Sequence, residues 1–262
     1  MARRRSTPVA LGLLAGVGIA LVALPLIGLI MRTPWSRVGE ILGAGSAQTA
    51  LRLSVVVATA SALLGLLVGF PLAWALARSE FRGKALVRAL VLLPLVMPPV
   101  VGGVALLSAF GRRGLVGGPL YDVFGVQITF TLWAAVLAAT FVSFPLIVLA
   151  LEVGLRSLDQ RLEQVASTMG AARWYVLRRV TLPLLAPQIA AGFVLAWARA
   201  LGEFGATITF AGNFPGRTQT LPLAVFEELQ TDPGGAIALS LLLVAASLVA
   251  IVTLRGQFLQ TR

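Results

Sequence analysis

Long apolar runs separated by short polar segments make up most of this chain. A helix needs about 20 apolar residues to cross the hydrocarbon core of a membrane. Six runs reach that length, at residues 9–31, 49–77, 86–110, 128–151, 186–210 and 234–254. The pattern predicts an all-α membrane protein with six transmembrane helices, folded as a single domain over residues 1–262.

The first apolar run follows Arg3, Arg4 and Arg5, an arrangement that also begins a secretory signal peptide. The apolar core of a signal peptide has about 7–15 residues, and the run in this chain is longer. We therefore favour an uncleaved first transmembrane helix.

Lysine and arginine are distributed unevenly between alternate connections. Cytoplasmic connections of membrane proteins carry the excess of these residues. With the N-terminus inside, the inner segments hold Arg3, Arg4, Arg5, Arg78, Arg82, Lys84, Arg88, Arg156, Arg161, Arg173, Arg178, Arg179, Arg255 and Arg262. The outer segments hold Arg32, Arg37, Arg112, Arg113 and Arg217. This asymmetry predicts that both termini are cytoplasmic.

The composition agrees with a lipid environment and excludes several classes of function. Hydrophobic residues make up 58% of the chain and charged residues 12%, against about 25% charged residues in soluble domains. The chain has no cysteine and no histidine, which excludes disulfides, histidine-ligated haem and the common zinc sites. The net charge of +11 arises between apolar runs, without the aromatic interleaving of nucleic-acid surfaces. We expect no metal site, no catalytic residue and no nucleic-acid partner.

The third apolar run contains three closely spaced prolines, Pro94, Pro98 and Pro99. Each proline removes a helix hydrogen bond and favours a kink. A membrane tolerates a broken helix where it is buried or lines a cavity. The sequence therefore predicts a bent or broken third span.

The connection of residues 152–185 is the longest on the inner side, and it has helical periodicity. Apolar residues recur on one face at Leu158, Leu162, Val165 and Met169, and Gly170 ends this first pattern. A second short helix follows, with Trp174, Leu177 and Val180 on one face, and Leu182-Pro183 ends it. The pattern predicts two amphipathic helices joined by glycine. They either lie on the bilayer surface or dock on a soluble partner.

The same connection resembles the EAA loop of ABC importer permeases. It reads Glu163-Gln-Val-Ala-Ser-Thr-Met-Gly170, then nine residues, then Val180-Thr-Leu-Pro183. The glycine and the Leu-Pro pair match the family pattern in type and spacing, and Ala166 matches its second alanine. Gln164 stands where glutamate is usual, Val165 stands in place of the first alanine, and Val180 stands for isoleucine. Glu163 is displaced by one position.

In that family the loop forms coupling helices that dock on a separate ATPase subunit. The resemblance assigns this role to Glu163, Gln164, Ala166, Gly170, Ala171, Val180, Leu182 and Pro183. The chain lacks a phosphate-binding loop of the Gly-x-x-x-x-Gly-Lys-Ser/Thr type. The resemblance thus implies no cofactor in this chain, with ATP and magnesium on the ATPase subunit. It also implies a periplasmic or lipoprotein oxyanion-binding protein, a homodimer of permeases, and a bacterial inner membrane.

The fifth apolar run contains Arg199 and Glu203, whose spacing of four allows an ion pair on one helical face. Ionisable residues inside a span are costly and are candidates for function. The pair is either structural or part of the translocation pathway. Thr207, Thr209 and Asn213 follow it and offer neutral donors, which suit an anion in transit.

Residues 198–222 are similar to the molybdate permease branch of the family, and sulfate permeases share a related core, Ala198-Arg-Ala-Leu-Gly-Glu-Phe-Gly205. The resemblance implies a permease for molybdate, with sulfate or tungstate as alternatives. An ion-coupled secondary transporter is an alternative of another class. That class usually shows several buried acids and an internal repeat, neither of which the sequence displays.

Overall fold

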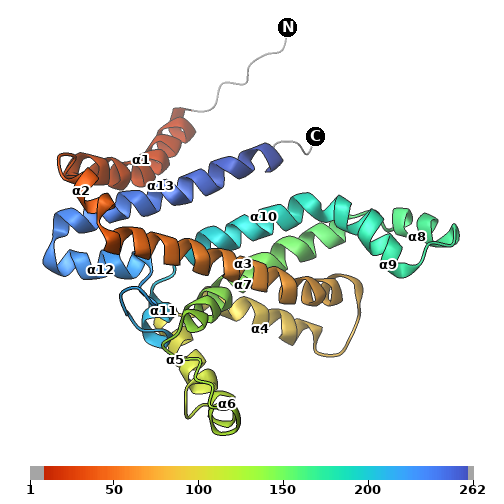
Figure 1. Cartoon of the computed structure of the whole chain (residues 1–262). Coiled ribbons are helices and arrows are strands. Elements are labelled where there is room, and N and C mark those ends of the chain that lie inside the picture. The colour runs from red at the N-terminus through yellow and green to blue at the C-terminus, as the bar shows by residue number, and fades with distance from the viewer. Residues whose placement is uncertain (1–8, 259–262) are drawn as a thin grey trace.

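The computed structural model describes residues 9–258, and helices account for all regular secondary structure in that range (Figure 1). The helices are α1 (Val9–Arg32), α2 (Val38–Gly43), α3 (Gly45–Arg78), α4 (Lys84–Val96), α5 (Pro99–Phe110), α6 (Gly117–Phe124), α7 (Leu132–Ser157), α8 (Gln160–Thr168), α9 (Arg173–Val176), the π-helix η1 (Leu177–Thr181), α10 (Leu182–Leu201), α11 (Gly205–Phe210), α12 (Leu221–Thr231) and α13 (Pro233–Phe258). The all-α prediction is confirmed.

Five of the described helical segments are long and apolar enough to cross a membrane. They are α1, α3, α7, the continuous segment from α9 through α10, and α13. The remaining apolar run is divided at Met97 and Pro98 into α4 and α5, so the break expected from the prolines is present. The count of six spans stays a prediction, because neither α4 nor α5 reaches the length of a full span.

Helices α3, α7 and α10 pack against one another and form the centre of the bundle. Small residues let their backbones approach closely. A Cβ atom on Gly154 of α7 would lie 2.7 Å from side-chain atoms of Gln188 and Leu185 on α10. A Cβ on Gly65 of α3 would lie 2.5 Å from Ile147 on α7. Close packing over small residues is the usual substitute for the hydrophobic effect between helices in lipid.

The first helix lies at the edge of the bundle, where it packs mainly against α13 (Figure 1). Its large apolar side chains are exposed, including Leu13, Leu21 and Met31. In water such a surface would be unstable, because its burial contributes about 25 cal/mol per Å² of apolar area. In a membrane the same surface is solvated by acyl chains.

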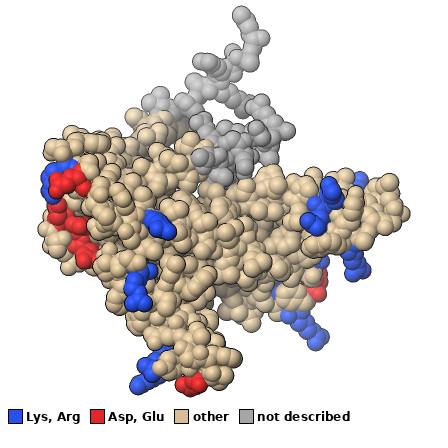
Figure 2. All heavy atoms as spheres, viewed as in Figure 1, with Lys and Arg blue, Asp and Glu red and all other residues tan. Residues whose placement is uncertain are grey.

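On the face shown in Figure 2, charged residues lie mainly at the two ends of the bundle and at the tip formed by α6, and most of the remaining surface is uncharged. Lys and Arg dominate the end formed by α8 and α9, whereas acidic residues gather near α12 at the opposite end. This agrees with the basic connections that the sequence analysis placed inside. Arg3, Arg4, Arg5 and Arg262 lie outside the described residues, and the cytoplasmic location of both termini stays a prediction.

Two predicted boundaries are wrong. The connection assigned to residues 152–185 is shorter, because α7 continues to Ser157 and buries Glu152. Leu182 and Pro183 do not end the second short helix, since the chain continues through η1 directly into α10. Pro183 has no N–H and its ring crowds the carbonyl four residues earlier. The preceding turn widens into a π-helix, which accommodates the proline without breaking the helix.

The fifth predicted span, residues 186–210, is also not one continuous helix. It ends as α10 at Leu201 and resumes as α11 at Gly205, with Gly202, Glu203 and Phe204 between them. Three further short helices, α2, α6 and α12, lie in connections that the sequence analysis left without structure.

Candidate functional site

The α8–η1 hairpin comprises α8, the turn at Gly170, α9 and η1. It contains six of the eight residues assigned to ATPase coupling, and Leu182 and Pro183 begin α10. Asp159 caps α8, where its side chain accepts a hydrogen bond from the Arg161 N–H at 3.0 Å. Such a cap satisfies one of the free N–H groups of the first helical turn. A carboxylate there also interacts favourably with the helix dipole.

Three of the predicted residues form the turn that ends α8. Gly170 has a φ of +86°, in the left-handed region that glycine adopts without steric cost. Its N–H donates to the Ser167 carbonyl at 3.0 Å, and the Ala171 N–H donates to the Ala166 carbonyl at 3.1 Å. These two bonds form a Schellman motif, in which a glycine in the left-handed conformation satisfies the free carbonyls of a helix end. The spacing of Ala166, Gly170 and Ala171 thus has a local structural cause.

Glu163 connects the hairpin to the bundle. Its Oε1 accepts a hydrogen bond from Arg78 Nη2 at 3.2 Å and another from Thr181 Oγ1 at 2.8 Å. Arg78 is in the last turn of α3 and Thr181 is in η1, so one carboxylate joins three segments. Gln164, the next residue, is exposed and makes no side-chain hydrogen bond within residues 9–258. Glu163, which stands one position away from the glutamate of the family pattern, thus connects α8 to α3 and η1.

The apolar face of α8 is turned away from the bundle. Leu162, Val165 and Met169 are 49%, 58% and 83% exposed. Val180 lies in η1 at the other end of the hairpin, and Leu182 and Pro183 are the first residues of α10. An exposed apolar helix face next to a paired carboxylate such as Glu163 is typical of a surface that docks on a partner.

A further buried acid, which was not predicted from the sequence, lies at the same end of the molecule. Glu152 on α7 is 5% exposed and pairs with Arg88 of α4 and with Arg156, the latter at 2.8 Å. The spacing of four between Glu152 and Arg156 could have indicated this pair. The partner from α4 could not be found from the sequence, because it requires the packing of α4 on α7.

The second candidate site lies at the break between α10 and α11. Glu203 is 3% exposed, and its Oε2 accepts a hydrogen bond from Arg199 Nη1 at 2.8 Å. Its Oε1 accepts a hydrogen bond from the Ala206 N–H at 2.9 Å. The expected ion pair is thus present, and the same carboxylate also caps the first turn of α11. It neutralises a cation and satisfies a backbone donor in the interior of the protein.

The two helices that follow the breaks, α5 and α11, pack on each other. A Cβ on Gly205 of α11 would lie 2.7 Å from Pro99 Cβ, and a Cβ on Gly103 of α5 would lie 2.6 Å from Thr209 Cβ. Gly205 therefore permits this close approach. A Cβ on Gly202, by contrast, would lie near only a backbone oxygen of its own helix, at 3.9 Å.

The three neutral residues expected to serve as donors differ in what they bind. Thr209 Oγ1 donates to the Gly205 carbonyl at 2.8 Å, and Asn213 Nδ2 donates to Glu227 Oε2 at 3.0 Å. Both groups are therefore engaged within the protein. Thr207 is buried and makes no side-chain hydrogen bond within residues 9–258. Their place in the translocation pathway stays a prediction.

Glu227 belongs to an acidic group at the opposite end of the bundle from the hairpin. The group also contains Glu40, Glu228 and Asp232. The backbone N–H of Gly235, and after it the guanidinium of Arg37, hold the pKa of the Asp232 carboxyl below its usual value. Arg37 Nη2 lies 2.9 Å from Asp232 Oδ2, which ties α2 to the start of α13.

Broken apolar helices, a capped charge pair in the interior and a protruding amphipathic hairpin define a polytopic membrane transporter subunit. The chain belongs to the family described as "Binding-protein-dependent transport system inner membrane component", whose model matches residues 63–261. It is accordingly a multi-pass protein of the inner membrane and a permease component without catalytic activity of its own. The alternative of an ion-coupled secondary transporter is set aside, because the family consists of components of binding-protein-dependent systems.

Curated relatives cover most of the chain. It is 51% identical over 235 residues to the molybdenum transport system permease protein ModB of Mycobacterium tuberculosis, covering 90% of this chain and 89% of the relative. It is 47% identical over 210 residues to the protein of the same name from Escherichia coli, covering 80% and 92%. A probable sulfate transport system permease protein of Chlorella vulgaris is 34% identical over 227 residues, covering 86% and 84%.

Solved structures share the fold. A bacterial ABC transporter that imports the polysaccharide alginate matches with a TM-score of 0.74 at 17% identity, covering 97% of this chain and 96% of the other. The MetNI methionine ABC transporter, in inward-facing conformations, matches with a TM-score of 0.62 at 17% identity, covering 81% and 95%. At this identity the likeness concerns the arrangement of the helices.

Proposed function

We propose that this chain is the membrane-spanning subunit of an ATP-driven importer for molybdate. The observation that carries the proposal is the 51% identity, over 90% of the chain, to a molybdenum transport permease. The identity to the sulfate transport relative is lower, at 34%. Sulfate and tungstate, which are also tetrahedral oxyanions, are the second candidates for the cargo.

The partner of the α8–η1 hairpin is an ATPase subunit that binds ATP and magnesium. The exposed side chains of Leu162, Val165 and Met169 supply the apolar contact. Glu163 transmits force, because it joins α8 to α3 through Arg78 and to η1 through Thr181. Movement of α8 on the ATPase thereby reaches two long helices of the bundle.

The break at Glu203 is the proposed moving part of the translocation pathway. α5 and α11 pack closely through Gly103 and Gly205, and both follow a break in an apolar helix. They can shift as one unit relative to α4 and α10, while the Arg199–Glu203 pair adds no net charge to the route of an anion. Thr207 offers a neutral hydroxyl nearby.

Two permeases enclose the pathway, and a periplasmic or lipoprotein binding protein delivers the oxyanion. The exposed apolar surface of α1 is available to a second copy or to lipid. The test is uptake of labelled molybdate by proteoliposomes that contain the permease, its ATPase and its binding protein. ATP-dependent uptake that excess sulfate does not suppress supports molybdate as the cargo. Uptake suppressed by equimolar sulfate favours the second candidate.

A further inference from the structure

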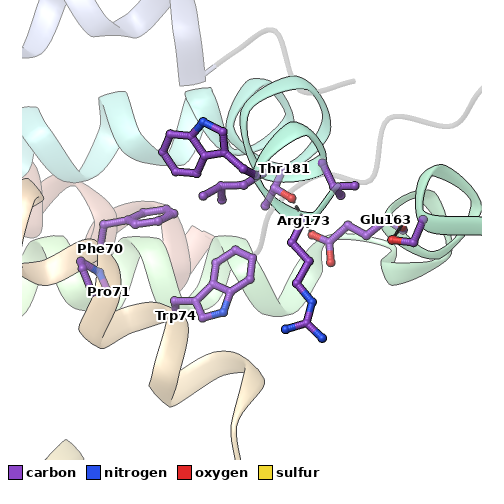
Figure 3. A pocket seen from close by; sticks show the side chains of 10 residues that line it. Phe70, Pro71, Trp74, Glu163, Arg173 and Thr181 are labelled. Atoms are coloured by element: carbon purple, nitrogen blue, oxygen red, sulfur yellow. Dashed lines mark hydrogen bonds between the residues drawn. The ribbon is translucent and has the colours of Figure 1, made fainter. Parts of the chain in front are cut away.

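A groove opens at the basic end of the bundle, between α3 and the α8–η1 hairpin (Figure 3). Its volume is about 680 Å³, within the range of about 300–1,000 Å³ that is typical of small-molecule sites. Its walls are apolar and are formed by Phe70, Pro71, Trp74, Trp174, Val176 and Leu177. Its polar lining consists of Glu163, Ser167, Arg173 and Thr181.

The side chains that α3 contributes along the groove become more polar toward the C-terminal end of the helix. Phe70, Trp74 and Arg78 are spaced by four and share one face of α3. The rings of Phe70 and Trp74 have centroids 6.0 Å apart, and Arg78 Cζ lies 5.9 Å from the Trp74 ring centroid. The order from apolar to aromatic to cationic matches a phospholipid from acyl chain to headgroup. Tryptophan is enriched at that level of a membrane.

Arg173 gives the groove an unpaired positive charge. Glu163 is already bound by Arg78 and Thr181, so its negative charge is compensated. The Arg173 guanidinium makes no ion pair and no side-chain hydrogen bond to any residue of the described range 9–258. A free guanidinium beside an apolar groove suits a phosphate group, which it can bind through two parallel hydrogen bonds.

The surface proposed to dock on the ATPase is a different part of α8 from the part that lines the groove. Glu163 and Ser167 of α8 line the groove, whereas Leu162, Val165 and Met169 of the same helix are exposed. The groove lies on the side of α8 that faces α3, a helix long and apolar enough to cross the membrane. The occupant of the groove is therefore expected from the membrane.

We propose that this groove binds one anionic phospholipid. Its acyl chain lies against Phe70, Trp74 and Leu177, and its phosphate is bound by Arg173. The lipid contacts α3 and the hairpin together, and so stabilises their arrangement. Only this consequence for coupling rests on the proposed function, because binding of the lipid can be measured on the permease alone.

Native mass spectrometry of the purified full-length chain tests the proposal, with equimolar phosphatidylglycerol and phosphatidylcholine supplied in detergent. We expect selective retention of phosphatidylglycerol. Arg173→Gln should weaken it about fivefold, since a basic residue at an anionic surface contributes roughly 1 kcal/mol. Arg161→Gln is the matched control, since Arg161 is an exposed α8 residue outside the groove lining, and should bind normally. Equal retention of the two lipids, or an equal loss in both variants, would overturn the proposal.

A second measurement locates the acyl chain. Limiting phosphatidylglycerol with brominated chains should quench tryptophan fluorescence of the wild type and of a variant with Trp35→Phe and Trp133→Phe. It should no longer quench a variant with Trp74→Phe and Trp174→Phe, which removes both groove tryptophans. The opposite pattern would contradict the assigned position. Release of the lipid on addition of the purified ATPase subunit would likewise overturn it and assign the groove to the ATPase.

Discussion

Glu163 and Arg78 are 85 positions apart in the sequence, yet their side chains form an ion pair with Nη2 and Oε1 at 3.2 Å. The Arg78 side chain is only 10% exposed, so water compensates little of its charge. The pair fixes α8 against the end of α3, and Thr181 adds a second bond from η1. An amphipathic hairpin with few other contacts to the bundle thereby has a defined position.

Glu163→Gln is expected to loosen this arrangement. It removes the negative charge beside a nearly buried arginine. The amide oxygen can still accept, but the hydrogen bond between two charged groups is weakened, at a cost of about 1–2 kcal/mol. The purified complex should still assemble in the membrane, but its ATP hydrolysis should respond less to the loaded binding protein. The measurement is the ratio of hydrolysis with and without that protein.

Gln164→Ala is the control for this prediction, because Gln164 is adjacent, exposed and without a side-chain hydrogen bond in residues 9–258. It should retain the wild-type ratio. If both variants behave alike, the link from Glu163 to α3 has no part in coupling.

The turn at Gly170 gives a prediction about conformation. Gly170 has a φ of +86°, and a Cβ there would meet nothing within 4 Å. Gly170→Val should therefore act through backbone strain, at a cost of about 1–3 kcal/mol. Gly170→Asn should be tolerated, since asparagine adopts this conformation more readily. We expect co-purification of the ATPase to fall for valine and to be largely kept for asparagine. Equal loss for both would point to steric contact with a partner instead.

The different exposures of Arg199 and Glu203 predict which of the two single substitutions lowers the folded yield more. The Glu203 side chain is 2% exposed and that of Arg199 is 34% exposed. Arg199→Gln leaves a buried carboxylate without a counter-charge, which costs about 3–5 kcal/mol in soluble cores. Glu203→Gln leaves a cation whose side chain is partly exposed, and the new amide oxygen can still accept a hydrogen bond from the Ala206 N–H. The folded yield should thus fall more for Arg199→Gln, and the double variant should recover part of it.

Size-exclusion profiles of the three variants measure this yield. Recovery of folding in the double variant without recovery of transport would favour a pathway role for the pair. Equal folded yields from the two single variants would contradict the conclusion that the more deeply buried Glu203 depends more on its partner than Arg199 does.

The topology gives a fourth prediction, for single cysteines at Ser36 and Ser157. Both residues are exposed, before α2 and at the end of α7 respectively. The distribution of Lys and Arg predicts Ser36 outside and Ser157 inside. An impermeant thiol reagent applied to intact spheroplasts should label only Ser36→Cys. Labelling of Ser157→Cys would reverse the orientation and move the α8–η1 hairpin out of reach of a cytoplasmic ATPase.

The sequence predicted features that depend on local chemistry. The turn at Gly170 follows from neighbouring residues through a Schellman motif. The break at Pro98 follows from the missing N–H of proline. The Arg199–Glu203 pair follows from a spacing of four.

What the sequence did not predict depends on contacts between distant segments. The predicted fifth span continued through Gly202–Phe204, where Glu203 is the single charged residue, so its length and hydropathy did not predict that α10 ends there. The hydrogen bond from Asn213 to Glu227 withdraws a donor that the sequence left free. The pairing of Glu163 with Arg78 required α8 to fold back on α3.

The proposed function makes this chain the path of an ATP-driven molybdate importer. The most direct measurement is the uptake of labelled molybdate into proteoliposomes that hold the permease, its ATPase and its binding protein, with enclosed ATP. We expect uptake that requires ATP and the binding protein and that persists under a proton or sodium ionophore. Uptake that ignores ATP and collapses with the ion gradient, or ATP-dependent uptake of an amino acid or sugar with no oxyanion uptake, would contradict it.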